Sequence, residues 1–588
     1  MTLRSAIAIA TVAAAAGAAL AQQTTTARGV VFLDRNADGA RQDGEPGIAG
    51  VAVTDSERVV LTDERGNFTL RIDAEDAIIS VVKPKGYQVA LDAQGLPRGY
   101  YIHKPNGSPD DGFAFRGVEP TGPLPGTIAF PLVPVDEPTS FTAIVFGDPQ
   151  PYSLEQVDFF RAEVIDPLVT AEGNAAGAAF GISLGDLVGD RLDLYGPLNE
   201  AQAMLGVPWY NVYGNHDMNF MSGHSGVTQA DPDRYADETF ERVYGPPNYA
   251  FQYGDVHFIV LDNVIWQGFD GYRDEAVDQW PAERQPQTRN YRGGLRDEQI
   301  RFIENYLAVV PKDDLVVLAF HIPLEMHGEG VHRVPELTEL LGALSSHPRT
   351  LSLSGHTHLQ QHWFFGSEHG YEPAPGAGPN QHTQADPARF PQPVHHHLNA
   401  VTASGSWFNG MRDEIGLPHT TMRDGAPNGY TLVHFDGNRY TTEFRAARQP
   451  ADHQMNIHLE TNASGNLPGE LDASSTGEVV VNVFNGVEGD AVEMRIVPNP
   501  ALSASSMAWT AMRFDVRPDP IYAATHAREQ QLPDELQSSW GLPEPRDSHH
   551  IWVGDIPAGL PAGTHAVEVR HTDLYGRTHV DRRTFRVK

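Results

Sequence analysis

Five short apolar runs, each ending in a polar motif, constrain the fold of this chain more than any other feature. Each run is long enough for one buried β-strand, and the polar residues follow it at once. In an open α/β sheet, side chains at the carboxyl ends of neighbouring strands lie close together, so the motifs predict one shared site. They are Gly-Asp-Pro-Gln at 147–150, Gly-Asp-Leu-Val-Gly-Asp at 185–190, Gly-Asn-His-Asp at 214–217, His-Ile-Pro at 321–323 and Gly-His-Thr-His at 355–358.

The polar residues of these motifs have the chemistry of metal ligands. Any one of them alone could cap a helix or a turn. Carboxylate, carboxamide and imidazole donors together suit first-row divalent metals better than calcium. Seven donors are too many for one ion that must also bind a substrate, whereas two ions that share a carboxylate account for them. The candidate ligands are Asp148, Gln150, Asp186, Asn215, His321, His356 and His358.

In order and spacing, the five motifs resemble the pattern of the calcineurin-like metallophosphoesterase superfamily over residues 141–359. The resemblance implies an α/β fold whose centre is a four-layer α/β/β/α sandwich, and a hydrolase that cleaves phosphoester bonds. It also implies how the ligands are divided. Asp148, Gln150 and His358 would bind one divalent ion, Asn215, His321 and His356 the other, and Asp186 would bridge them.

The resemblance gives two residues of the third motif a role other than metal binding. His216 would protonate the leaving oxygen, and Asp217 would orient His216. A hydroxide that bridges the two ions would attack phosphorus in line. The ions expected are Mn, Fe, Zn or Mg. Gln150 stands where the family usually has His, which favours manganese, iron or magnesium over zinc at the first site.

The segments on both sides of the motifs are predicted to be β-rich. Residues 27–134 contain short strand-like runs and no long helical period, which favours a β-sandwich. Over 139–365, apolar strands alternate with amphipathic stretches, as expected for the catalytic domain. Strand character returns in a β-rich associated domain at 390–588. This order resembles that of a subgroup of secreted bacterial phosphoesterases with N- and C-terminal associated domains.

A second candidate metal site lies in the N-terminal segment. Residues 34–45 match the calcium-loop pattern, in which alternate oxygen ligands wrap one cation and a glycine permits the sharp turn. The flanks are strand-like, so the loop resembles the calcium loops of bacterial surface β-sandwich repeats and not an EF-hand. The alternative is a solvated acidic turn. The predicted Ca²⁺ ligands are Asp34, Asn36, Asp38 and Glu45.

Two further segments carry weaker signals. Residues 402–430 resemble the region that links the catalytic and C-terminal domains in the same subgroup, and Trp407, Asp424 and Tyr430 are the candidate substrate-binding residues. The alternative is that Trp407 packs in a core. Three consecutive histidines at 395–397 look like a metal clip or tag. They have no partner motif, so a solvated run is predicted.

Composition and the N-terminus bear on partners and location. The formal net charge of −34 argues against a nucleic-acid-binding surface, and the absence of Cys excludes disulfides and thiolate chemistry. Residues 1–21 have a basic start, an Ala-rich apolar run and an Ala-Leu-Ala cleavage site, as in a secretory signal peptide. No other segment approaches transmembrane length, so a periplasmic or extracellular protein is predicted.

Together, these features predict a secreted dimetal hydrolase of phosphodiesters or phosphomonoesters, with small molecules or lipid headgroups as substrates. The alternative is a cell-surface or periplasmic binding protein with a vestigial hydrolase domain, and the intact motifs argue against it. The motifs specify the phosphoryl chemistry and not the leaving group. Nothing in the sequence indicates an oligomeric state.

Overall fold

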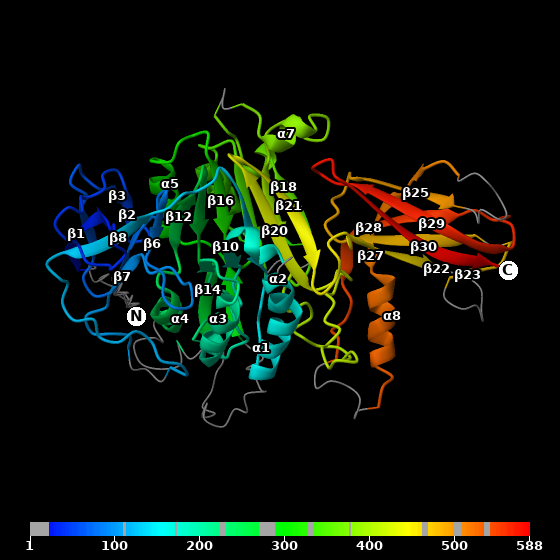
Figure 1. The fold of residues 1–588 in the computed structure, drawn as a ribbon, viewed down its shortest axis with the longest axis horizontal. Helices are drawn as coiled ribbons and strands as arrows, with labels where there is room; N and C mark the ends of the chain where they lie inside the picture. The colour runs from blue at the N-terminus through cyan, green and yellow to red at the C-terminus, as the bar shows by residue number, and fades with distance from the viewer. Residues whose placement is uncertain are drawn as a thin grey trace, which may run out of the picture.

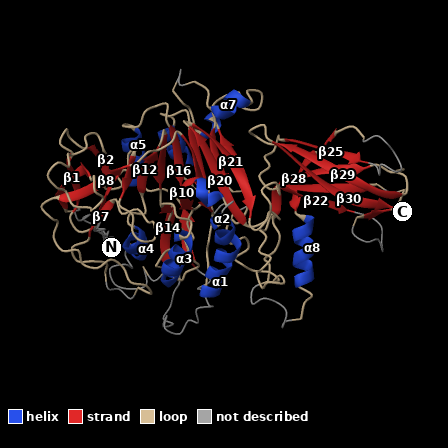
Figure 2. Ribbon diagram, viewed as in Figure 1, coloured by secondary structure: helices blue, strands red, loops and turns tan. Residues whose placement is uncertain are grey.

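The structure, a computed structural model, has three parts that lie in a row along the longest axis of the molecule (Figure 1). The N-terminal part and the C-terminal part, at the two ends of the row, consist almost entirely of strands, and most helices lie in the central part (Figure 2). The predicted signal peptide lies outside the described residues. The structure describes residues 23–109, 113–170, 173–219, 222, 231–269, 289–326, 334–374, 378–460, 469–474, 476–497, 507–533 and 541–588.

Two β-sheets form the centre of the molecule. One has the strand order β11 (Trp209–Asn211), β10 (Ala178–Ser183), β9 (Ser140–Phe146), β20 (Gly429–Asp436) and β21 (Arg439–Ala446). The other has the order β12 (Tyr249–Tyr253), β13 (Val256–Val260), β16 (Leu315–Ala319), β17 (Thr350–Ser354), β19 (His395–Asn399) and β18 (Gln361–Phe365). Strands β9, β10 and β11 run parallel, and so do β13, β16, β17 and β19. In each sheet, the carboxyl ends of these strands therefore lie at one edge.

The strand sequences explain why both faces of these sheets are covered. Along β9, Ala143 and Val145 enter the core between the sheets, whereas Ile144 and Phe146 pack against helices. Strand β16 alternates in the same way. The predicted four-layer α/β/β/α sandwich is therefore confirmed. The first sheet is covered by α1 (Leu154–Phe160), the π-helical turn η1 (Arg161–Ile165), α2 (Asp166–Val169) and α3 (Tyr195–Ala203), and the second by α5 (Asp297–Leu307) and α6 (Leu337–Leu344).

Shorter elements of the central part connect these layers. A hairpin follows β13, and isolated helical turns lie in the connections between strands. They are η2 (Asn174–Gly177), η3 (Leu192–Leu194), η5 (Asp233–Tyr235), α4 (Glu238–Tyr244), β14 (Val264–Phe269), β15 (Arg289–Gly293), η7 (Ser367–His369) and α7 (Gln381–Ala385).

The N-terminal part is a sandwich of two four-stranded sheets around one apolar core. The turn at residues 62–68 joins strands that pair in different sheets, so it crosses the sandwich instead of closing a hairpin. One sheet contains β4 (Asn67–Asp73), β1 (Thr24–Leu33), β8 (Ile128–Pro134) and β6 (Tyr87–Val89), and the other β3 (Val59–Leu61), β2 (Ala52–Thr54), β5 (Ala77–Val81) and β7 (Tyr100–His103).

The C-terminal part is a second sandwich with its own core. Its helix, α8 (Pro520–Glu529), lies on the side that faces the central part (Figure 1). One sheet contains β22 (Met455–Glu460), β24 (Gly477–Val483), β28 (Asp547–Ile556) and β27 (Arg513–Pro518). The other contains β23 (Glu470–Leu471), β30 (Thr578–Val587), β29 (Gly563–Thr572), β25 (Ala491–Val497) and β26 (Thr510–Ala511).

Three strands from the range predicted as the C-terminal domain complete the central sheets. Strand β19 pairs with β17, and β20 lies between β9 and β21. The chain therefore stays in the central part up to residue 446 and only then enters the second sandwich. Residues 395–397, predicted to be a solvated run of histidines, are instead a fully buried stretch of β19. The predicted domain limits stay predictions.

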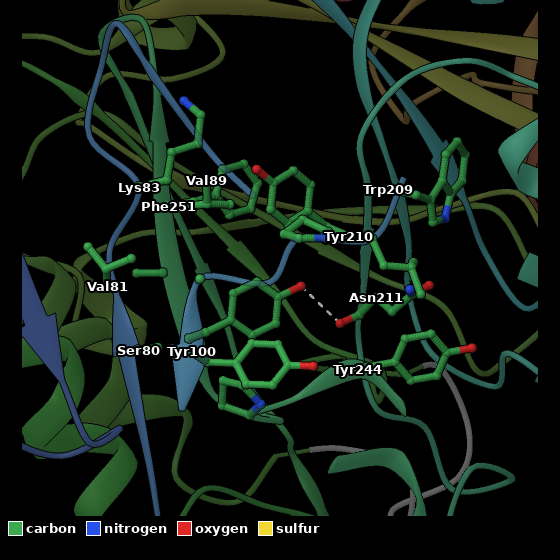
Figure 3. A pocket seen from close by; sticks show the side chains of 16 residues that line it. Ser80, Val81, Lys83, Val89, Tyr100, Trp209, Tyr210, Asn211, Tyr244 and Phe251 are labelled. Carbon is green, nitrogen blue, oxygen red and sulfur yellow. Dashed lines mark hydrogen bonds between the residues drawn. The ribbon is translucent and has the colours of Figure 1, made fainter. Parts of the chain in front are cut away.

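The N-terminal sandwich packs firmly against the central part. Lys104 is buried and pairs with Glu238 of α4 (2.8 Å) and with Asp76 (3.2 Å). Beside this junction lies a cavity of about 60 Å³, walled largely by apolar and tyrosine side chains, including those of Tyr100 and Tyr210 (Figure 3). The described residues that line it include no carboxylate and no imidazole, so this cavity is unlike a metal site.

Candidate metal centre

All five motifs follow the carboxyl ends of central strands, as predicted. Gly214 and Gly355 allow the loops to approach each other closely. A Cβ atom on Gly214 would lie 2.1 Å from the backbone nitrogen of Asp186, and one on Gly355 would lie 2.3 Å from Oδ2 of Asp148. Only glycine fits at these two positions.

Asp186 lies at the centre of the site, and each of its two oxygens faces a different group of donors. Oδ1 lies 3.2 Å from Nε2 of His321, which in turn lies 3.1 Å from Oδ1 of Asn215 and 3.2 Å from Nδ1 of His356. Within the described part of the chain, Asp186, His321 and His356 form a group whose ligand atoms all lie within 4.8 Å of one another.

The second donor group lies on the side of Oδ2 of Asp186, which accepts a hydrogen bond from the Gln150 amide (3.2 Å). Oε1 of Gln150 lies 3.0 Å from Nε2 of His358, and Oδ1 of Asp148 lies 3.7 Å from the same nitrogen. The Asp148 carboxylate also accepts the backbone N–H of His356 at 2.9 Å, which ties the first motif to the fifth.

The histidine tautomers show that both donor groups fit a cation. Nδ1 of His321 donates to the carbonyl of Leu184 (2.8 Å), and Nδ1 of His358 donates to the carbonyl of Gly405, because a carbonyl can only accept. In the neutral ring, each Nε2 therefore carries a lone pair that points at acceptor oxygens. Histidines oriented in this way by a carbonyl are the usual form of metal-bound imidazole.

The electrostatics of the site also favour positive charge. Burial lowers the pKa of His321, but Asp186 and Asp148 raise it more, to about 9. Burial raises the pKa of Asp148 to about 7, and the neighbouring Asp186 contributes to this rise. Two buried carboxylates this close together need a compensating cation, and divalent ions held by these donors would provide it.

The backbone at the site is strained, which indicates that the ligand positions are held by the surrounding fold. A non-glycine residue with positive φ costs about 1–3 kcal/mol. Such residues concentrate in the first, second and fifth motifs, where the chain turns sharply after the strand to direct a side chain inward. The predicted ligands with positive φ are Asp148 (38°), Gln150 (43°), Asp186 (46°), His356 (79°) and His358 (55°).

His216 lies on the wall of the same pocket, and its partner differs from the one that the resemblance implied. Nδ1 of His216 lies 3.0 Å from Oδ1 of Asp190, whose carboxylate can only accept, so Nδ1 carries the proton. Nε2 lies 4.0 Å from Oδ2 of Asp186. Asp190 is therefore the residue that orients this ring.

Asp217, which was predicted to orient His216, instead holds the loop backbone together. Its carboxylate accepts the N–H groups of Gly214 (2.9 Å) and Leu187 (3.1 Å), and the hydroxyl of Tyr195 donates to it at 3.2 Å. Burial raises the pKa of Asp217 to about 8, and Asp186 adds to this rise. Asp217 thus connects the loops of the second and third motifs without contacting the imidazole.

A pocket of about 170 Å³ opens above the donors. Among the predicted substrate residues, Trp407 lines this pocket and stacks on His358 with ring centroids 4.1 Å apart. Asp424 and Tyr430 are not among the described residues that line it. Asp424 is buried against the C-terminal part, and the Tyr430 hydroxyl accepts a hydrogen bond from Asn174 (2.9 Å) in the helical layer. The remaining wall residues are Tyr291, Met326, Thr357, Arg423 and Arg546.

Asn399, at the end of β19, fixes the loop of the fifth motif. Its side-chain amide donates to the carbonyl of Leu359 (2.7 Å) and to the hydroxyl of Thr357, while its oxygen accepts from Ser354 (3.0 Å). Thr357 lies between the two predicted histidine ligands of this motif. The buried histidines of β19 extend the same network, since His397 lies 3.2 Å from the Ser354 hydroxyl.

The four predicted calcium ligands do not form one cage. Oδ2 of Asp34 accepts the N–H of Gly39 (2.9 Å), and both oxygens of Glu45 accept backbone N–H groups of the same loop. The amide of Asn36 donates to Asp38 (2.9 Å). Among the described residues, the acidic and histidine side chains whose ligand atoms lie within 4.8 Å of one another are those around Asp186. A Ca²⁺ site in this loop stays a prediction.

The fold and the gathered donors define a class of protein, the metal-dependent phosphoester hydrolases. Three family models match the chain in order: the N terminal of calcineurin-like phosphoesterase at residues 35–118, calcineurin-like phosphoesterase at 142–360, and the C terminal of calcineurin-like phosphoesterase at 397–579. The chain therefore belongs to the calcineurin-like phosphoesterase family, in the subgroup with N- and C-terminal associated domains. Membership implies divalent metal ions and a phosphoester substrate.

Two solved structures show weak similarity. Purple acid phosphatase PPD1 from yellow lupin (Lupinus luteus) seeds has 13% identity and a TM-score of 0.31, over 72% of this chain and 67% of that chain. GAP50, the anchor in the inner membrane complex of Plasmodium, has 13% identity and a TM-score of 0.28, over 53% of this chain and 85% of that chain. No curated protein matches the chain. Among the described helices, none is long and apolar enough to cross a membrane.

Proposed function

We propose that this chain is an exported phosphoesterase with a two-metal centre, acting on phosphodiesters or phosphomonoesters of small molecules or lipid headgroups. The observation that carries the proposal is the position of Asp186 between two groups of donors, with one carboxylate oxygen toward each. A single ion would leave one of these groups without a partner. The predicted signal peptide supports export.

Different residues of the chain would bind the two ions and transfer the proton. Asp148, Gln150 and His358 would hold one ion, Asn215, His321 and His356 the other, and Asp186 would hold both. When bound, the two divalent ions supply neutralisation of phosphoryl charge and a lowered pKa for water. His216 is oriented by Asp190 so that its Nε2 can deliver a proton to the leaving oxygen. The carboxamide at Gln150 favours manganese, iron or magnesium over zinc.

Metal depletion and reloading test this proposal. The full chain is stripped with a chelator, reloaded with each of the four metals, and assayed on p-nitrophenyl phosphate and bis-(p-nitrophenyl) phosphate. We expect no activity without metal, two ions per chain at full activity, and at least a thousandfold loss of kcat in Asp186→Asn. The exposed Asp313→Asn is the matched control.

Three results would count against the proposal. Full activity with one ion per chain would show that the second ion is not needed. Activity that survives complete depletion would show that the reaction does not depend on metal. Tight binding of two ions without turnover of either ester would indicate a binding protein with a vestigial hydrolase domain.

A further inference from the structure

Two arginines, Arg423 and Arg546, stand on the wall of the metal pocket, and they come from distant parts of the chain. Arg423 lies between β19 and β20, whereas Arg546 directly precedes β28 of the C-terminal sandwich. The whole chain has a net charge of −34. Two cationic side chains at one pocket of such an acidic protein mark that wall as the place where an anion is received.

The two arginine segments hold each other in place. The backbone N–H of Arg546 donates to the carbonyl of Arg423 (3.0 Å), and Nε of Arg423 donates to the carbonyl of Glu544 (3.1 Å). Behind them, the hydroxyl of Tyr522 from α8 donates to the carbonyl of Pro543 (2.8 Å). The C-terminal sandwich thus presents Arg546 to the pocket on a braced segment.

Asp424 links this wall to the loop of the fifth motif. Its buried carboxylate accepts the backbone N–H of Gln360 (2.7 Å) and lies 3.1 Å from Nε2 of His550. Gln360 follows His358 by two residues, and His550 lies on β28 four residues after Arg546. One carboxylate therefore ties the fifth motif, the Arg423 segment and the C-terminal sandwich together.

We propose that Arg423 and Arg546 form a second anion subsite, which selects phosphoesters whose leaving group carries a further phosphate or another dianion. This inference rests on the proposed function, because the metal donors and His216 would engage the scissile phosphoryl group and leave the arginine wall for the rest of the substrate. Guanidinium groups pair with phosphate through two parallel hydrogen bonds, so arginine is well suited to this role.

The physical consequence is a preference that depends on the second anion. Hydrogen bonds to a charged group are worth about 1.5–3 kcal/mol, which corresponds to roughly tenfold to hundredfold in kcat/KM. A neutral alcohol oxygen carries no charge, so it gains far less from the two guanidinium groups than a phosphate does. Asp424, predicted from the sequence as a substrate residue, then acts as a positioning residue for Arg423.

A matched pair of esters tests the subsite. Propane-1,3-diol monophosphate and propane-1,3-diol bisphosphate have the same scissile bond and differ in the second phosphate. We expect kcat/KM at least tenfold higher for the bisphosphate, with the ratio falling about tenfold in Arg546→Gln and in Arg423→Gln and largely retained in Arg546→Lys. Arg412→Gln, at an exposed ion pair with Glu155, is the control and should leave the ratio unchanged.

A binding measurement separates this proposal from the proposed function. Calorimetry on the full chain compares propane-1,3-bisphosphonate with propylphosphonate, neither of which is hydrolysed at its P–C bonds. We expect tighter binding of the bisphosphonate by at least tenfold, lost in Arg546→Gln while the melting temperature stays within about 2 °C of wild type.

The outcomes divide clearly. Equal binding of both phosphonates, or an equal loss on both esters in Arg546→Gln, would overturn the subsite even if the enzyme is fully active. The expected binding difference without turnover of any ester would support the subsite and overturn the proposed function.

Discussion

Replacing Asp190 by Asn tests the assignment of His216 as the proton donor. The carboxylate of Asp190 lies 3.0 Å from Nδ1 of His216, and both side chains are mostly buried, with 10% and 18% exposure. Asn keeps an acceptor oxygen at the same place but removes the charge. Asp190 has φ of 62°, a conformation that Asn adopts readily, so the substitution adds no backbone strain.

The magnitude follows from the kind of hydrogen bond that is lost. A bond to a charged group contributes about 1.5–3 kcal/mol and a neutral one about 0.5–1.5 kcal/mol, so the variant loses about 1–2 kcal/mol of support for the imidazolium form. This corresponds to a loss of about 5- to 30-fold in kcat when proton delivery limits the rate.

Two substrates isolate the effect. An alkyl phosphate releases an alkoxide, which needs a proton, whereas p-nitrophenyl phosphate releases a stable phenolate that leaves without one. Steady-state kinetics on Asp190→Asn should therefore show the 5- to 30-fold loss on the alkyl ester and little loss on the aryl ester. Asp193→Asn, three residues further on in an exposed ion pair with Arg191, is the matched control. An equal loss on both esters would refute proton delivery by His216 and indicate a structural effect on the loop.

Two further predictions concern residues outside the pocket. Burial raises the pKa of Glu163 from 4.5 to about 7, so the protonated side chain contributes its full stability below pH 4.5, and this contribution is lost as the pH rises through 7. Glu163→Gln should therefore raise the free energy of unfolding at pH 8 by up to about 3 kcal/mol and give no gain at pH 4.5. Thermal melts at both pH values measure the difference. Asn399→Ala should weaken metal binding about 10- to 100-fold in competition with a chromophoric chelator, whereas Asn438→Ala, which loses a hydrogen bond to the carbonyl of Asp313, should not.

The sequence was most informative where local chemistry and strand pattern coincide. Each of the five apolar runs forms a strand, because a run of β-branched and aromatic residues can be buried on both faces only between two layers. Gly214 and Gly355, which belong to the predicted motifs, allow the close backbone approaches between the loops. The central fold and the gathering of donors were therefore predictable from the chain alone.

Pairings across long sequence separations were not predictable in the same way. Asp190 and Asp217 are both carboxylates near His216, and only the path of the loop after β10 decides which of them reaches the ring. The polar run at 395–397 gave no sign of burial in the sequence. Its histidines can be buried because they form hydrogen bonds with hydroxyl groups of a neighbouring strand, such as that of Ser352, which contacts both His395 and His397. Arg546 reaches the pocket through a tertiary contact that no local pattern encodes.

The turn at residues 62–68 shows the same limit on a smaller scale. Its Asp, Gly and Asn residues do make a tight turn, with Gly66 at φ of 78°. Turn chemistry fixes the reversal of the chain, but the partners of the flanking strands depend on which neighbours bury their apolar faces. Here β3 and β4 enter opposite sheets of the sandwich.

The late addition of β20 to the first central sheet limits the order in which the molecule can fold. Strand β9, which ends at the first motif, has β20 as one of its two neighbours, and β20 begins only at Gly429. A ribosome makes the chain from its N-terminus, so the first ligand-bearing strand exists for most of synthesis without its partner. Such long-range pairing delays completion of the sheet. The sheet that carries the first motif therefore stays incomplete until about three quarters of the polypeptide has been made.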